Sequence, residues 1–207
     1  MQDQAWRRPL RADAARNIEK IISAALECFR EEGPNVSLKT VAARAGVGPA
    51  TLFRNFADKD ALVLAAVERR LKAKVDPVAE LALENPDAAS GLVEVLSAVM
   101  QVANEEHHLL AAVAGRRQLL VGIAGKMFES LGILLQRGQA QGTLREELRL
   151  LDLVRIVAML IGVGDTVEPG STAWRRYVAL LEDAIRTHRE NRPLPPLEHI
   201  PDVDVIP

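Results

Sequence analysis

Short polar and cationic side chains cluster on either side of a glycine turn in the first third of the chain. Lys39 and Thr40 precede Gly46, and Arg54 and Asn55 follow it. Arginine and asparagine form paired hydrogen bonds with guanine and adenine edges in the major groove, whereas lysine and hydroxyl side chains bind phosphate oxygens. These residue types therefore point to nucleic-acid recognition through hydrogen bonds.

The residues around this turn have the pattern of two short helices. Ser37 can cap the first helix, Gly46 can end it in a left-handed conformation, and Pro49 suits the first turn of the second, where its missing N–H is not needed. We predict that the apolar members of the pair point inward: Leu38, Val41, Ala42, Ala45, Val47, Leu52 and Phe56. The outward set, which we predict to contact DNA, is Ser37, Lys39, Thr40, Pro49, Ala50, Thr51, Phe53, Arg54, Asn55 and Lys59.

A longer amphipathic helix precedes the pair. It begins near Asp13, its apolar stripe runs from Ile18 to Phe29, and Gly33-Pro34 ends it. Residues 1–75 contain 14 Lys and Arg against 9 Asp and Glu, a net charge of +5 in a chain whose total is −2. Such an asymmetry favours a polyanion partner for the N-terminal part. Four arginines there are expected either to lie along DNA or to form a solvated basic arm: Arg7, Arg8, Arg11 and Arg16.

The rest of the chain predicts helices and no strands. Asp58 can cap a helix that reaches about Val75 and ends before Asp76-Pro77. Beyond Pro86 a helical apolar stripe returns, formed by Leu92, Val95, Leu96, Val99, Met100 and Ala103. Gly138 and Gly142 mark an interruption in this pattern.

The C-terminal part predicts two more helices and a tail. Residues 148–163 are too apolar to have a solvent-facing side, so we expect them to be buried, either within the domain or between subunits. Ser171 or Thr172 can cap a last helix that begins near Trp174. Residues 191–207 are rich in proline and are expected to be extended or disordered.

The segment SLKTVAARAGVGPATLFRNFADKDAL, preceded by FREEG, resembles the DNA-binding signature of the TetR family of transcriptional regulators. The resemblance covers roughly residues 13–70 and implies an all-α fold. In that fold, a three-helix helix-turn-helix domain at 1–58 joins a larger helical ligand-binding and dimerisation domain at 59–190, with residues 59–75 as the linking helix.

The resemblance also implies a function. It implies a DNA-binding transcriptional regulator, a repressor, that binds a palindromic operator as a homodimer through its last two long helices and responds to a small-molecule effector. Three features depart from the family pattern. Phe53 replaces a usual tyrosine whose hydroxyl contacts phosphate, Asn55 stands where histidine is common, and Gly48-Pro49 replaces a usual serine cap.

The second domain offers candidate ligand contacts rather than catalytic groups. Ligand cavities are mostly apolar with few polar groups, although ordinary core packing uses the same residue types. The candidates are Met100, His107, Met127, Phe128 and Trp174. His107 and His108 are adjacent and so point to different sides of a helix, and we therefore expect no metal site. We find no nucleophile beside a base, and we expect no enzymatic activity, no catalytic residues and no cofactor.

The remaining features concern location and an alternative function. The single cysteine, Cys28, excludes an internal disulfide. No stretch approaches roughly 18 apolar residues and no export signal is evident, so we expect a cytoplasmic protein without a membrane span. The alternative to a regulator is a helical scaffold or ligand-binding protein without operator-specific DNA binding.

Overall fold

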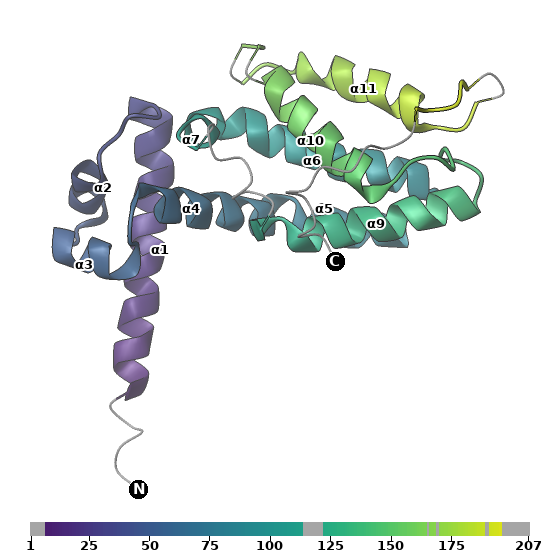
Figure 1. The fold of residues 1–207 in the computed structure, drawn as a ribbon. Coiled ribbons are helices and arrows are strands. Elements are labelled where there is room, and N and C mark those ends of the chain that lie inside the picture. Colours follow the sequence, from purple (N-terminus) through teal and green to yellow (C-terminus); the bar gives the residue numbers. More distant parts are fainter. Residues whose placement is uncertain (1–6, 114–121, 165, 169, 189–190, 196–207) are drawn as a thin grey trace, which may run out of the picture. The chain divides into compact units, whose positions relative to one another are not determined.

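The computed structural model describes residues 7–113, 122–164, 166–168, 170–188 and 191–195, with residues 7–13 as backbone only. The described residues form helices connected by short turns, with one isolated β-bridge between Leu144 and Arg186 (Figure 1). The chain divides into two compact units. The first contains Met1–Arg69 and His108–Arg117, and the second contains Arg70–His107 and Gln118–Pro207.

The first unit begins with three helices, α1 (Arg7–Glu32), α2 (Leu38–Ala45) and α3 (Pro49–Asn55). Most of α4 (Lys59–Lys74) belongs to it as well, together with all but the first residue of α7 (His107–Ala111). Helix α1 packs against α2, and α2 packs against α3. Their shared core contains Ile21, Ala25, Phe29, Val41, Leu52 and Leu62.

The predicted first and fourth helices are present, with one boundary to correct. Helix α1 begins at Arg7 rather than near Asp13, because Pro9 falls in its first turn, where a missing N–H is tolerated. Asp58 caps α4 as predicted, since its Oδ1 accepts the Ala61 N–H at 2.8 Å. The division between the compact units falls inside α4, later than the boundary between residues 58 and 59 expected from the sequence.

The second unit is a helical bundle around α6 (Ala88–Glu105). Helix α6 packs against α5 (Asp76–Glu84), α9 (Gly125–Ala140), α10 (Leu150–Gly164) and α11 (Trp174–Ile185). The residues predicted to form its apolar stripe are all buried, and all of them except Ala103 belong to one core: Leu92, Val95, Leu96, Val99, Met100 and Ala103. Helix α5 was not predicted, because Asp76-Pro77 was interpreted as a helix end. Pro77 instead lies in the first turn of α5.

Two turn assignments in the second unit need correction. Gly138 does not interrupt a helix but lies within α9, where a Cβ atom would come within 2.5 Å of Leu144 Cδ1. The chain therefore needs glycine there for close packing, and it turns at Gly142, whose φ is 67°. The N-cap of α11 is Ala173, without a side-chain cap, rather than Ser171 or Thr172.

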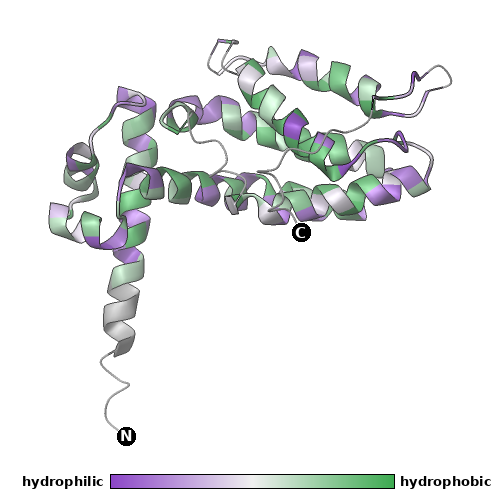
Figure 2. Cartoon of the chain, viewed as in Figure 1, coloured by the Kyte–Doolittle hydropathy of each residue, from purple (hydrophilic) through white to green (hydrophobic). Residues whose placement is uncertain are grey.

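Helix α10 is largely apolar but only partly buried within a single chain (Figure 2). Leu153, Ile156, Val157 and Leu160 face the core, whereas Met159 is 62% exposed. Residues 148–163 are therefore not completely buried within the domain, and their burial between subunits stays a prediction. No helix among the described residues has both the length and the apolar character to span a membrane. Of the predicted tail, residues 191–195 are described and have no helix or strand.

Candidate nucleic-acid interface

The helix-turn-helix is held by hydrogen bonds at both ends of α2. At its start, Ser37 Oγ accepts the Thr40 N–H at 3.1 Å and lies 2.9 Å from the Thr40 hydroxyl. At its end, Gly46 has a φ of 66°, and its N–H donates to the Ala43 carbonyl at 3.1 Å. The predicted cap and the predicted left-handed end are both confirmed. The two caps determine where α2 begins and ends, and the left-handed Gly46 sets the direction in which the chain enters α3.

Helix α3 presents one face to the core and another to solvent. Leu52 and Phe56 are buried, as predicted, and they fix the rotation of the helix about its axis. Consequently Ala50, Phe53 and Arg54 are exposed, and 52% of Phe53 is accessible to solvent. Pro49, also exposed, begins the helix, and Gly48 is its N-cap.

Two polar side chains of α3 interact with the helix itself. Asn55 is half-buried, and its Nδ2 donates to the Thr51 carbonyl at 2.7 Å. Arg54 Nη2 donates to the Thr51 hydroxyl at 3.1 Å, which orients the guanidinium group along the exposed face. Arginine has five N–H donors, so most of those on Arg54 are still available for a base or a phosphate.

An ion-pair cluster that the sequence interpretation missed joins α2 to α1. Arg44 Nη2 lies 2.8 Å from Glu31 Oε2, with Glu27 and Glu32 at 3.8 Å from the same guanidinium. The hydrogen bond from Arg44 holds the pKa of the exposed Glu31 carboxyl below its usual value. The acidic residues near the end of α1 could have indicated an ion-pair cluster, but the sequence does not show which cation pairs with them.

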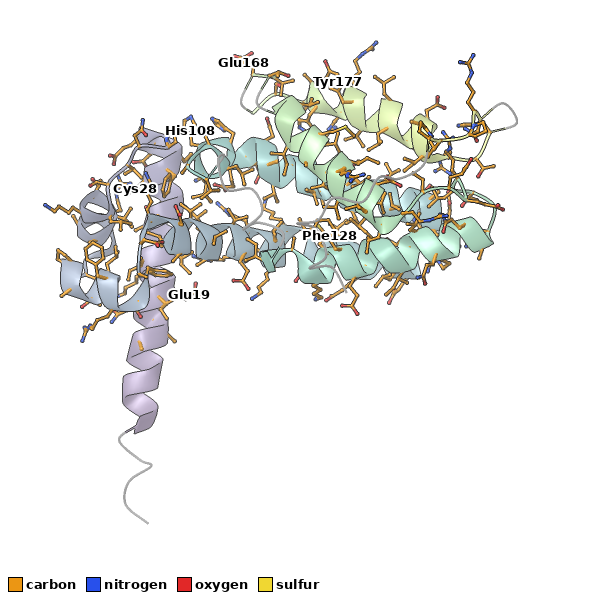
Figure 3. All side chains as sticks on the ribbon, in the orientation of Figure 1. Glu19, Cys28, His108, Phe128, Glu168 and Tyr177 are labelled. Atoms are coloured by element: carbon orange, nitrogen blue, oxygen red, sulfur yellow. The ribbon has the colours of Figure 1, made fainter. Side chains whose placement is uncertain are left out.

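Cys28 lies beside this cluster in the core of the first unit (Figure 3). Its side chain is fully buried, and desolvation raises the pKa of its thiol. The thiol is therefore protonated at neutral pH and packs as a small apolar group.

The predicted phosphate contacts occupy different environments. Lys39 is exposed on α2, as is Arg16 on α1. Lys59 is half-buried; its Nζ donates to the Pro34 carbonyl at 2.7 Å and lies 5.3 Å from the centroid of the Phe29 ring. The side chains of Arg7, Arg8 and Arg11 lie outside the described residues.

The candidate ligand residues belong to the second unit. Met100, Met127, Phe128 and Trp174 are buried in its apolar core. Phe128 is labelled in Figure 3. His107 is half-buried, and its Nδ1 lies 3.3 Å from the Asn104 carbonyl oxygen. Trp174 also borders an open groove of about 610 Å³ between α5, α6 and α11, which Val93, Ala98, Gln101, Arg175 and Glu182 help to line.

Comparison with known proteins identifies the first unit. Residues 21–66 match the family described as "Bacterial regulatory proteins, tetR family". The HTH-type transcriptional regulator SAB2452 of Staphylococcus aureus is 38% identical over 63 residues, which are 30% of this chain and 34% of that protein. The chain thus matches about a third of the length of this curated relative.

Two solved structures resemble the chain over most of its length. The TetR transcription regulatory protein from Mycobacterium vanbaalenii is 29% identical, with a TM-score of 0.56, over 86% of this chain and 100% of that one. The TetR transcriptional regulator SCO0520 from Streptomyces coelicolor is 27% identical, with a TM-score of 0.51, over 82% of this chain and 98% of that one. The capped helix-turn-helix thus belongs to a segment that matches the tetR family model, and the chain is similar over most of its length to two TetR regulators.

Proposed function

We propose that this protein is a ligand-responsive transcriptional repressor that binds a palindromic DNA operator as a homodimer. The observation that carries this proposal is the orientation of α3. Burial of Leu52 and Phe56 turns Ala50, Phe53 and Arg54 outward on a short helix that follows a capped turn. In helix-turn-helix proteins the second helix enters the major groove and its exposed side chains contact base edges.

The surrounding residues suit the phosphate backbone. Exposed Lys39 on α2 can neutralise a phosphate, and the hydroxyl groups of Ser37 and Thr40 lie at the start of the same helix. In this proposal Arg54 contacts a base or phosphate, while Pro49 and Ala50 allow close approach to the groove.

Homodimerisation would use α10 and α11. Met159 on α10 and Tyr177 and Leu180 on α11 are large apolar or aromatic side chains that remain exposed in a single chain. Tyr177 points away from the bundle (Figure 3). Large apolar groups of this kind are characteristic of subunit interfaces. A two-fold dimer would place its two α3 helices on half-sites roughly 34 Å apart, one turn of DNA.

The effector would bind in the second unit. Its interior is lined by apolar side chains, including the predicted contacts Met100, Met127 and Phe128. An effector that binds more tightly to a conformation unable to engage both half-sites shifts the protein toward that conformation. The loss of DNA affinity is limited by the difference between the effector's affinities for the two conformations. The apolar lining favours an apolar effector.

Selection of bound sequences from a random pool of double-stranded DNA tests the proposal. We expect enrichment of a palindrome whose affinity falls steeply as salt increases, because cations are released from neutralised phosphates. A helical scaffold or ligand-binding protein would enrich no sequence. Enrichment of a non-palindromic site by a monomer would contradict the dimeric mechanism while leaving DNA binding intact.

A further inference from the structure

Phe29, in the last turn of α1, lies between side chains from two other parts of the first unit. Lys59, the first residue of α4, places its Nζ 5.3 Å from the centroid of the Phe29 ring. His108, which lies on α7 and is labelled in Figure 3, places its Nδ1 3.1 Å from the Phe29 carbonyl oxygen. Because a carbonyl oxygen can only accept, the imidazole N–H is the donor.

The same contacts extend to the loop that leads into the helix-turn-helix. Lys59 Nζ donates to the Pro34 carbonyl at 2.7 Å, and the Gly33 N–H donates to the Phe29 carbonyl at 3.0 Å. The Phe29 ring itself is buried. We call this set of contacts among Phe29, Pro34, Lys59 and His108 the junction. Residues 33–36 connect it directly to Ser37, the cap of α2.

The electrostatics of the junction favour a cation and a hydrogen-bond donor. The C-terminal end of α1 carries the partial negative charge of the helix dipole. An ammonium group over the face of an aromatic ring and against a carbonyl oxygen is attracted by both. Lys59 therefore has two internal partners, whereas Lys39 on α2 is exposed and available for phosphate binding.

We propose that Lys59 and His108 are positioning residues, which hold the end of α1 and the 33–36 loop so that α2 and α3 are set for DNA binding. Neither residue contacts DNA. Phe29 and His108 both belong to the first unit, and His108 directly follows the end of the second unit's first segment in the chain. The effect on DNA rests on the proposed function, whereas the effect on α2 does not.

Hydrogen exchange on the full chain without DNA tests the structural part. We expect Lys59→Met and His108→Leu each to increase amide exchange about fivefold in residues 33–45, the effect of losing one hydrogen bond. His108→Asn, which restores an N–H near the Nδ1 position, should return exchange toward the native rate. Lys126→Met, which removes an exposed lysine in the second unit, is the matched control and should leave these amides unchanged.

Salt dependence of binding to the selected palindrome tests the DNA part. A lysine that contacts phosphate contributes about 0.9 to the slope of log K against log salt, or about 1.8 for a symmetric dimer. Lys39→Met should reduce the slope by that amount. Lys59→Met and His108→Leu should weaken binding about fivefold with the slope unchanged.

The outcomes separate the two proposals. A fall in slope for Lys59→Met equal to that for Lys39→Met would show a direct phosphate contact and overturn the positioning role. Unchanged exchange in residues 33–45 for both Lys59→Met and His108→Leu would overturn the junction itself. Faster exchange with no enriched DNA sequence would support the junction while contradicting the proposed function.

Discussion

The Nε atom of Arg70 lies 2.7 Å from the Oε1 atom of Glu106, which joins the end of α4 to the residue that ends α6. The Glu106 side chain is only 4% exposed and that of Arg70 is 24% exposed. Both residues belong to the second unit and stand next to positions where the chain passes between the units. Breaking a buried ion pair costs stability, because the remaining charge stays out of water without the attraction of that partner.

Replacement of Arg70 should therefore destabilise the second unit. We expect Arg70→Met to lower the free energy of unfolding by about 3 kcal/mol, at the lower end for a buried pair because Arg70 is partly exposed. Its neighbour Arg69 has a 39% exposed side chain and pairs with Glu19, so Arg69→Met should cost under about 1 kcal/mol. Urea unfolding followed by circular dichroism would measure both. Equal stability of the two variants would contradict the importance of the buried pair.

Asp87 should make the stability of the second unit depend on pH. It caps α6, with its Oδ2 accepting the Ser90 hydroxyl at 2.6 Å and its Oδ1 accepting the Ala89 N–H at 3.0 Å. The Ser90 hydrogen bond is the main cause that holds the pKa of Asp87 below its usual 3.8. A carboxyl group whose pKa is lower in the folded protein stabilises the fold at pH values above its pKa in the unfolded chain. This contribution is lost as the pH falls through the pKa in the folded protein.

Two substitutions separate the cap from the charge. Asp87→Ala should cost about 1 kcal/mol at pH 7 because the α6 cap is lost. Asp87→Asn should keep most of the cap but lose the pH-dependent contribution. The difference in free energy of unfolding between this variant and the native protein should therefore be smaller at pH 3 than at pH 7. Unfolding experiments at both pH values would measure this. An Asp87→Asn difference that is the same at pH 7 and pH 3 would show that the charge does not contribute.

The sequence predicted the local features of the first unit because each depends on a few neighbouring residues. Ser37, Gly46 and Asp58 act within one helical turn, and Leu52 and Phe56 orient α3 by their spacing alone. The contacts it missed join residues far apart in the chain. The bonds from Lys59 to Pro34 and from His108 to Phe29 depend on tertiary packing, which one sequence does not reveal.

The second unit was predicted in class but not in detail. Proline at Asp76-Pro77 was given a helix-ending role, although proline is also favoured in a first turn, as in α5. Gly138 was interpreted as a break, whereas its role is to admit the Leu144 side chain. The ligand residues remain a prediction, because apolar side chains have the same pattern in a core and around a ligand.

The exposed faces of α10 and α11 should control the oligomeric state. Leu180 is exposed on α11, so Leu180→Glu should leave each chain folded but place a charge in the proposed subunit interface. Light scattering should then report a monomer, with a large loss of affinity for a palindromic site. Leu81→Glu, at an exposed leucine on α5, is the matched control and should remain dimeric. Dimers of equal affinity for both variants would place the interface elsewhere.

Phe53 should contribute an apolar contact to base recognition. Its exposed ring cannot donate a hydrogen bond to phosphate, but an apolar side chain can contact the C5-methyl group of thymine. Replacement of that thymine by deoxyuridine should weaken binding about fourfold, the value of one buried methyl group. Phe53→Ala should abolish this difference. A deoxyuridine effect that persists in Phe53→Ala would assign the methyl contact to another residue.

The affinity of Arg54→Ala for the selected palindrome tests the central claim most directly. Arg54 is exposed on α3 and held in place by the Thr51 hydroxyl, so it is positioned to read a base or bind a phosphate. Fluorescence anisotropy should show a loss of about 1–3 kcal/mol in binding free energy and relaxed selectivity at one position of each half-site, with the dimer intact. Unchanged affinity and selectivity in a folded Arg54→Ala dimer would contradict the assignment of α3 as the helix that recognises DNA.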